Sequence, residues 1–294
     1  MTEKSELIIE NGISAKAYWG DIWRHRELLL FLAWRDILVR YKQTVIGVSW
    51  VLIRPLLTMI ILTVVFGRIA NLSSGDTPYA ILVFTGLLPW FYFSNATSES
   101  SSSLITNGNL LSKVYFPRMI VPASTVLVAA VDFIVSISVL VLLMLWYGLA
   151  PTWHLLLLPA LGFWVGLLSL GIGLLFSALT VRYRDFRHIV PFVLQLGIYA
   201  SPVGYSTALI PEKWAPLYYL NPIAGIIDAF RWSIIGDVPS TYGIISALII
   251  TVAVLLTLAS GPAAFASFWL RPFGLRMRPG LSLPQICPKK LFGR

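Results

Sequence analysis

Few residues in this sequence have the types and spacing that catalysis or metal binding requires. The three histidines lie on separate segments, at positions 25, 154 and 188, and the single cysteine, Cys287, stands in a basic tail. The phosphate-binding pattern G-x-x-x-x-G-K-[ST] and the H-E-x-x-H and C-x-x-C pairs do not occur. We therefore predict no catalytic residue, metal site or internal disulfide. If ATP drives the work of this chain, another polypeptide must hydrolyse it.

Ionisable residues inside apolar stretches are the next candidates. Asp132 lies 13 residues into the stretch 119–147, and an acid near mid-membrane predicts a functional site by default. A protonated acid or an interhelical hydrogen bond would explain it equally well, and Arg54 is a candidate partner. The 13 residues between Arg54 and Arg68 make about 20 Å of helix, short of a ~30 Å hydrocarbon core. One of the two must therefore snorkel or face protein.

Composition places these residues in a membrane. Of the 294 residues, 57% are hydrophobic and 12% are charged, and the mean hydropathy is +0.79, which excludes an ordinary soluble domain. The net charge of +9 would suit nucleic acid, but repeated apolar runs make membrane topology the better explanation. We predict an all-α integral membrane protein that binds no nucleic acid.

Six apolar segments are long enough to cross a bilayer, at about 20 residues each. They lie near residues 46–68, 78–98, 119–147, 154–181, 189–209 and 241–269. With both termini in the cytosol, 19 of the 22 Lys and Arg fall on the cytosolic side and 3 outside, as the positive-inside rule requires. We expect no cleaved signal peptide, because the mixed-charge N-terminus has no apolar core.

Three further segments differ from the spans. Residues 18–41 combine tryptophans with basic residues on an apolar stripe, which predicts an amphipathic helix in the cytosolic interface; a solvated helix packing on another domain is the alternative. Residues 207–240 are too apolar for water and too interrupted to span, so we expect short re-entrant helices lining a pathway. The basic, proline-rich tail is expected to be disordered or in loose contact with anionic lipid.

The stretch 98–122 carries a short amphipathic motif between two spans. Leu110, Leu111, Val114 and Tyr115 form one apolar helical face that is far too short to cross a bilayer. We predict that a soluble protein docks there, on the cytosolic surface.

This stretch also carries a family resemblance. The pattern N..L..KVYFPR...P at 107–122 is similar to a block of ABC-transporter permeases that export polysaccharides, such as O-antigen and teichoic-acid exporters. In order, RYKQT at 40–44, RYRD at 182–185, SPV at 201–203 and NP at 221–222 followed by Arg231 also resemble that family. The resemblance implies a coupling helix at about 107–117 that contacts a separate ATPase, through Asn107, Leu110, Leu111, Lys113, Val114, Tyr115, Phe116, Pro117 and Arg118.

The family's substrates are polysaccharides on a polyprenyl pyrophosphate carrier. Arginine pairs well with phosphate, so we hypothesise a headgroup entrance at Arg40, Lys42, Arg54, Arg182 and Arg184; positive-inside anchors are the plain alternative. Sugars stack on rings, so we hypothesise a channel lined by Trp90, Tyr92, Phe93, Asp132, Tyr199 and Tyr205, with packing or lipid-facing aromatics as the alternative. The outer gate would comprise Tyr218, Tyr219, Asn221 and Arg231.

Together these expectations describe a permease of a bacterial inner membrane. A cytosolic region at 1–45 precedes a six-span domain at 46–270, and the tail covers 271–294. The resemblance implies a homodimer with two copies of a cytosolic ATP-binding subunit, which would hold ATP and magnesium, while this chain holds no cofactor. The cargo would be a lipid-linked polysaccharide.

Other functions stay open at this point. A membrane transferase would need a catalytic acid, histidine or metal cluster at a membrane face; the candidates are Asp132, Asp185 and Asp228, and they are dispersed. An ATP-independent carrier would need no docking helix and would show interrupted spans in both halves. A drug or small-lipid exporter is the nearest rival within the export class.

Overall fold

The structure is a computed structural model that describes residues 15–42, 47–73, 75, 77–113, 116–150 and 152–260. Within these ranges the chain is helical and contains no strand. The predicted all-α class is confirmed. The tail 271–294 and the first 14 residues lie outside the described residues.

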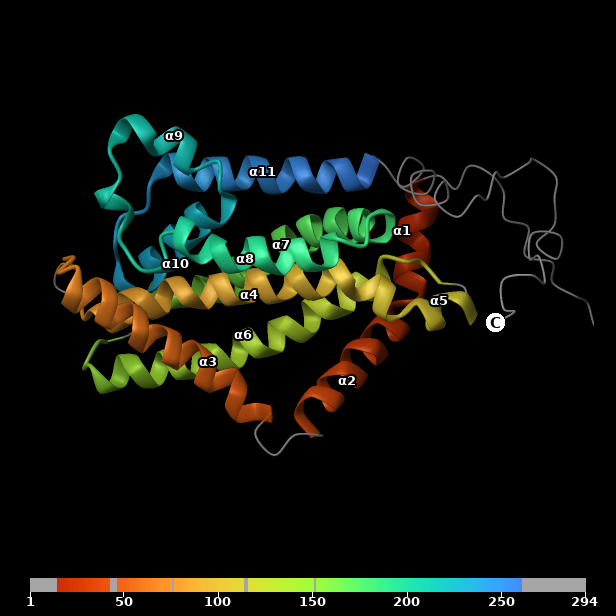
Figure 1. Cartoon of the computed structure of the whole chain (residues 1–294), viewed down its shortest axis with the longest axis horizontal. Coiled ribbons are helices and arrows are strands. Elements are labelled where there is room, and N and C mark those ends of the chain that lie inside the picture. The colour runs from red at the N-terminus through yellow and green to blue at the C-terminus, as the bar shows by residue number, and fades with distance from the viewer. Residues whose placement is uncertain are drawn as a thin grey trace, which may run out of the picture.

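Among the described residues, four helical stretches are long and apolar enough to cross a membrane, by length and composition. They are Ser49–Ile69 in α3 (Gly47–Leu62) and the π-helical η1 (Thr63–Ile69), Tyr79–Thr106 (α4), Ile120–Trp146 (α6), and Trp153–Arg182 in η2 (Trp153–Leu157) and α7 (Leu158–Arg182). In Figure 1, α8 (Phe186–Ala200) and α11 (Thr241–Ser260) run alongside these helices.

The short elements gather at the two ends of the bundle. At one end lie α1 (Ala15–Arg24), the start of α2 (Arg26–Lys42), and α5 (Gly108–Lys113) (Figure 1). At the other end lie η1, α9 (Ala215–Tyr218) and α10 (Pro222–Ile235); the turns η3 (Thr207–Leu209) and η4 (Glu212–Trp214) precede α9. The coupling segment and the predicted outer gate are therefore at opposite ends.

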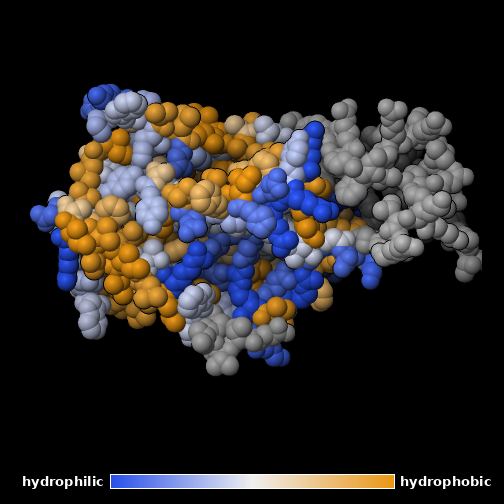
Figure 2. Space-filling model, viewed as in Figure 1, coloured by the Kyte–Doolittle hydropathy of each residue, from blue (hydrophilic) through white to orange (hydrophobic). Residues whose placement is uncertain are grey.

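Hydrophobic residues form much of the visible side of the bundle in Figure 2. Hydrophilic residues gather in the middle and toward the right of the described part, the side on which Figure 1 shows α2 and α5. This division is the one expected of a bundle whose flank meets lipid and whose one end meets water.

Helix α4 is the centre of the fold. Of its most apolar 18-residue window, 89% is buried, against 17% for α3 with η1. Glycines of α7 allow it to lie close: a Cβ on Gly166 would come within 2.7 Å of the Tyr92 hydroxyl, and one on Gly173 within 2.6 Å of Ser100 Oγ. The glycines at positions 166 and 173 therefore serve the packing of α7 on α4.

The second predicted span ends earlier than α4 does. We placed its end at residue 98, but the helix continues through the serine run to Thr106. Ser101 and Ser103 donate hydrogen bonds of 2.7 Å to carbonyls three residues earlier. These hydroxyls find acceptors within the helix, which explains why a polar run does not stop it.

Close contact between α10 and α11 depends on Gly225. A Cβ at this position would lie 2.0 Å from the carbonyl oxygen of Gly243, and backbone cannot yield as a side chain can. We predict that Gly225→Ala destabilises the protein by about 1–3 kcal/mol, the range for overpacking. The thermal unfolding midpoint in detergent measures this, with Gly20→Ala in α1, where a Cβ meets nothing within 4 Å, as the control. An unchanged midpoint for Gly225→Ala would contradict this packing.

Candidate functional site

A charged cluster joins α2 to α4 and α6. Arg40 Nη1 donates to Asp132 Oδ2 at 2.5 Å, and Arg40 Nη2 forms an ion pair with Glu99. The Tyr41 hydroxyl donates to the other oxygen of Asp132. Two carboxylates from two neighbouring helices thus share one arginine from α2.

The electrostatics of this cluster keep its donors protonated. Burial works to lower the pKa of Arg40, but the attraction of Glu99 and then Asp132 outweighs it, and the pKa is raised. Burial, and then the hydrogen bond to Asp132, raise the pKa of Tyr41. Arg40 therefore stays a cation and Tyr41 a neutral donor.

The partner of Asp132 is Arg40 and not Arg54, which sequence reasoning had named. Arg54 is exposed on α3, with its guanidinium carbon 5.1 Å from the centroid of the Phe91 ring. Sequence reasoning missed Glu99 altogether. Its position could have drawn attention, because Glu99 is an acid that directly follows the apolar stretch 78–98 and stands inside the serine run.

The coupling segment packs onto the chain itself. Phe116 is 4% exposed in a small core cluster, and Leu110 and Leu111 pack partly against it. The cluster comprises Leu32, Leu104, Phe116, Ile120, Val121 and Ala178. The two leucines that predicted a docking face therefore also serve this chain's own core, and the outward residues of α5 include Asn109 and Lys113, both exposed.

Other residues of the segment fix where α5 begins. Asn107 accepts a hydrogen bond from Arg35 Nη2 at 3.3 Å, and its amide nitrogen donates to the Ser103 carbonyl at 3.0 Å. Pro117 is buried and Arg118 exposed. Val114 and Tyr115 lie outside the described residues. The predicted contact between residues 107–117 and a separate ATPase stays a prediction.

The exposed cations hypothesised to receive a headgroup lie on three elements. Lys42 ends α2, Arg54 is on α3, and Arg182 and Arg184 are at the turn between α7 and α8. Arg182 also lies over the Tyr183 ring, 5.2 Å from its centroid. Arg40 differs from these four, because two carboxylates already neutralise it.

The aromatic residues hypothesised to line a channel divide into two groups. Trp90, Tyr92 and Phe93 are buried in the main core, where Tyr92 stacks on Phe133 with centroids 5.0 Å apart. Tyr199 on α8 is 64% exposed, and Tyr205 is half-buried. Their role along a channel stays a prediction.

A polar cluster closes the opposite end of the bundle around Arg231. This side chain is 3% exposed, and its guanidinium donates to the carbonyls of Pro202, Val203 and Tyr205 at 2.5, 3.2 and 2.9 Å. These carbonyls follow the end of α8, where no helical donors remain. The buried guanidinium therefore satisfies the carbonyls of a non-helical segment, as buried backbone requires.

The remaining outer-gate residues join the same cluster. The hydroxyls of Tyr205 and Tyr218 lie 3.1 Å apart, and Asn221 Nδ2 donates to Ser201 Oγ at 2.9 Å. The Tyr219 hydroxyl donates to Asp228 at 2.8 Å, and the Thr207 hydroxyl donates to its other oxygen at 3.1 Å. Sequence reasoning counted Asp228 among dispersed acids; its position three residues before Arg231, on the same helical face, was the available signal.

In the part of the chain that the structure describes, no three His, Cys, Asp or Glu side chains come together as they would around a metal ion. The contacts described here are hydrophobic packing, ion pairs and hydrogen bonds to backbone carbonyls. The end of the bundle at α5 has exposed residues that a partner could contact, and the end at α10 has a polar segment that Arg231 fixes.

Comparison with known proteins identifies the family. Residues 27–235 match the family described as ABC-2 type transporter, which is well over half of the chain. The chain belongs to the ABC-2 type transporter family. The charged cluster, the small core cluster and the polar cluster around Arg231 all fall within the matched range, whereas α11 lies beyond it.

Curated relatives of this ABC-2 protein carry transport names. The O-antigen export system permease protein RfbA of Klebsiella pneumoniae is 30% identical over 226 residues, which cover 76% of this chain and 86% of that protein. RfbA of Myxococcus xanthus is 29% identical, over 72% of this chain and 81% of its own length. The polysialic acid transport protein KpsM of Escherichia coli is 25% identical, over 69% and 78%.

Removing Arg40 should cost stability, because Asp132 and Glu99 lose their counter-ion. The Arg40 and Asp132 side chains are 30% and 12% exposed, so we expect Arg40→Met to destabilise by about 2 kcal/mol, between the values for exposed and buried pairs. Thermal unfolding in detergent measures the loss. Arg26 is an exposed arginine on the same helix, so Arg26→Met should leave the unfolding midpoint nearly unchanged. Equal shifts of the midpoint for both variants would show that the charged cluster does not stabilise the fold.

Proposed function

We propose that this ABC-2 protein is the transmembrane subunit of an ATP-driven exporter that moves polyprenyl-pyrophosphate-linked O-antigen polysaccharide from the cytosol across the bacterial inner membrane. The observation that carries the proposal is the match to two O-antigen export permeases over more than four fifths of their length. A second polysaccharide transporter, named for polysialic acid, matches more distantly.

In this proposal α8 and α11 complete a set of six crossings. Both run beside the four longer helices (Figure 1), although α8 has 15 residues, about 22 Å of helix. The chain then alternates between the ends so that both termini are cytosolic. Helices α9 and α10 would form the re-entrant segment, which the buried Arg231 and Asp228 support from within.

A second copy would face α3 and α8. Their exposed surfaces carry polar groups, Arg54 on α3 and Gln195 on α8, next to the exposed Tyr199. A polar side chain at membrane depth faces protein or a water-filled cavity rather than lipid. A homodimer joined along these helices would place Arg54, Gln195 and Tyr199 beside the path of the polysaccharide.

The energy would enter through α5. Two copies of an ATP-binding subunit, holding ATP and magnesium, would contact the outward face of this helix, while Leu110 and Leu111 hold it to α2, α4 and α6 through the small core cluster. Arg54, Arg182 and Arg184 are exposed and suited to receive the pyrophosphate. We leave Lys42 out of this role, because it lines a separate groove between α2 and α6.

Docking at α5 is tested by charge reversal. Lys113 is exposed, so Lys113→Glu should leave folding intact yet reverse the charge at the docking face. We expect about tenfold less of the adjacently encoded ATP-binding subunit to co-purify, equivalent to about 1.4 kcal/mol. Lys213→Glu, an exposed lysine at the other end, should co-purify normally; undiminished complex with Lys113→Glu would argue against this docking face.

Export itself is tested in a strain that lacks only this chain. Lipid-linked O-antigen should accumulate at the inner membrane and vanish from the cell surface, because synthesis continues without a path outward. Complementation with the wild-type chain or with Lys213→Glu should restore surface O-antigen, measured by gel analysis of extracted lipopolysaccharide. Surface O-antigen that persists in the strain, together with altered drug or lipid efflux, would favour the rival exporter class.

A further inference from the structure

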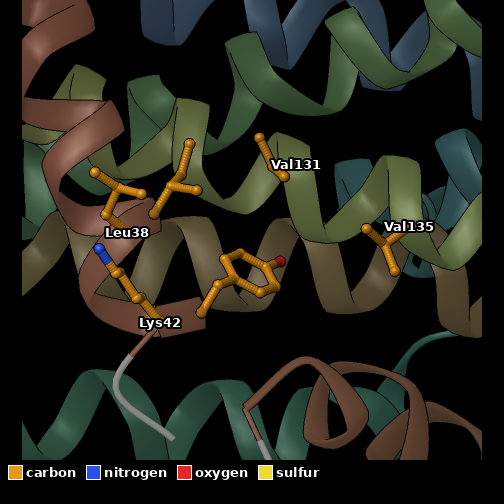
Figure 3. A pocket seen from close by; sticks show the side chains of 6 residues that line it. Leu38, Lys42, Val131 and Val135 are labelled. Atoms are coloured by element: carbon orange, nitrogen blue, oxygen red, sulfur yellow. The ribbon is translucent and has the colours of Figure 1, made fainter.

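An open apolar groove lies between α2 and α6. It is lined by Ile37, Leu38, Tyr41 and Lys42 from α2 and by Val131 and Val135 from α6, and its volume is about 420 Å³ (Figure 3). This volume falls within the range of about 300–1,000 Å³ typical of small-molecule sites. Lys42 is the one charged residue in the lining.

The charged cluster holds the groove in shape. Arg40 and Tyr41 both bind Asp132, so α2 is fixed against α6 directly beside the groove. The Tyr41 hydroxyl donates to Asp132, so the Tyr41 side chain contributes its ring carbons to the wall of the groove. The groove therefore offers hydrocarbon along its length and an ammonium group from Lys42.

The surfaces leading to the groove suit the bilayer. On α2, Phe31, Trp34 and Leu38 are exposed and follow helical spacings of three and four residues. On α6, Leu127 and Ile134 are exposed and two helical turns apart. An apolar stripe with a tryptophan on a helix beside a span is typical of the membrane interface. The occupant of a groove continuous with these stripes is a lipid chain.

Lys42 decides the kind of lipid. It lies four residues after Leu38 on the same helical face, it is exposed, and no ion pair joins it to any residue that the structure describes. In Figure 3 its side chain extends beside Leu38, across from Val131. Arg40, two residues before Lys42, pairs with Glu99, which directly follows the apolar stretch 78–98. Lys42 is therefore near the cytosolic end of that stretch, from which a lysine can reach the phosphate level of the cytosolic leaflet, where anionic lipids attract basic residues.

We propose that this groove binds a resident bilayer phospholipid with an anionic head group, such as phosphatidylglycerol, with one acyl chain against Tyr41, Val131 and Val135 and the head group paired with Lys42. The site is separate from the path on α3 and α8, and it does not depend on the proposed function. A bound lipid would join α2 to α6 on the flank where the charged cluster does so from within.

The test uses the purified full-length chain in a neutral detergent. Phosphatidylglycerol should raise the thermal unfolding midpoint more than phosphatidylcholine of the same chains, since binding to the native state stabilises it. Lys42→Gln should remove this preference, weakening phosphatidylglycerol binding about fivefold, the effect of one lysine at an anionic membrane surface. Val135→Trp, which fills the groove, should abolish the shift by both lipids.

Two matched variants serve as controls. Lys213→Gln removes an exposed lysine far along the chain from the groove, and Val141→Trp adds the same ring to an exposed position of α6 outside the lining; both should respond as the wild type does. Equal shifts by the two lipids in the wild type would overturn the proposal, as would a preference that survives Lys42→Gln. Displacement of phosphatidylglycerol by a polyprenyl pyrophosphate would also overturn it, by assigning the groove to the carrier lipid.

Discussion

The structure depends on one constraint, that polar groups removed from water must find partners within the protein. Helix α4 meets it most severely, because protein surrounds nearly all of its apolar window. Ser101 and Ser103 donate to carbonyls of their own helix, and Arg231 donates to the carbonyls that follow α8. Without these internal partners, burying the polar part of α4 or the non-helical segment after α8 would cost stability.

The same constraint explains the position of α2. A carboxylate within a span is costly unless a cation reaches it, and Asp132 receives Arg40 and Tyr41 from a helix that precedes all the spans. Glu99 brings α4 into the same contact. Helix α2 is thus anchored to α4 and α6 by charge, while its apolar stripe stays exposed.

Hydropathy and charge predicted the helical class, and spans at 119–147 and 154–181 agree closely with α6 and the η2–α7 stretch. The motifs pointed to the ABC-2 family because several weak patterns occur in the right order. Three-dimensional pairing was not predictable: Arg40 and Asp132 are 92 residues apart, and no periodicity relates them. The same holds for Arg231 and Pro202, since local patterns carry no information on which distant carbonyls lack donors.

Helix α4 connects the two ends as one continuous helix, with Pro89 inside it. Its 28 residues extend over about 42 Å, from Asn107, where α5 begins, to Tyr79, whose hydroxyl donates to the Gly204 carbonyl at 2.5 Å. Near that end, a Cβ on Gly86 would lie 3.0 Å from Val203, so the helix backbone touches the segment that Arg231 fixes. Close-packed interiors transmit strain rather than absorb it. A force on α5 along this axis would therefore reach the distant segment through α4, by way of Pro89 and the close contact at Gly86.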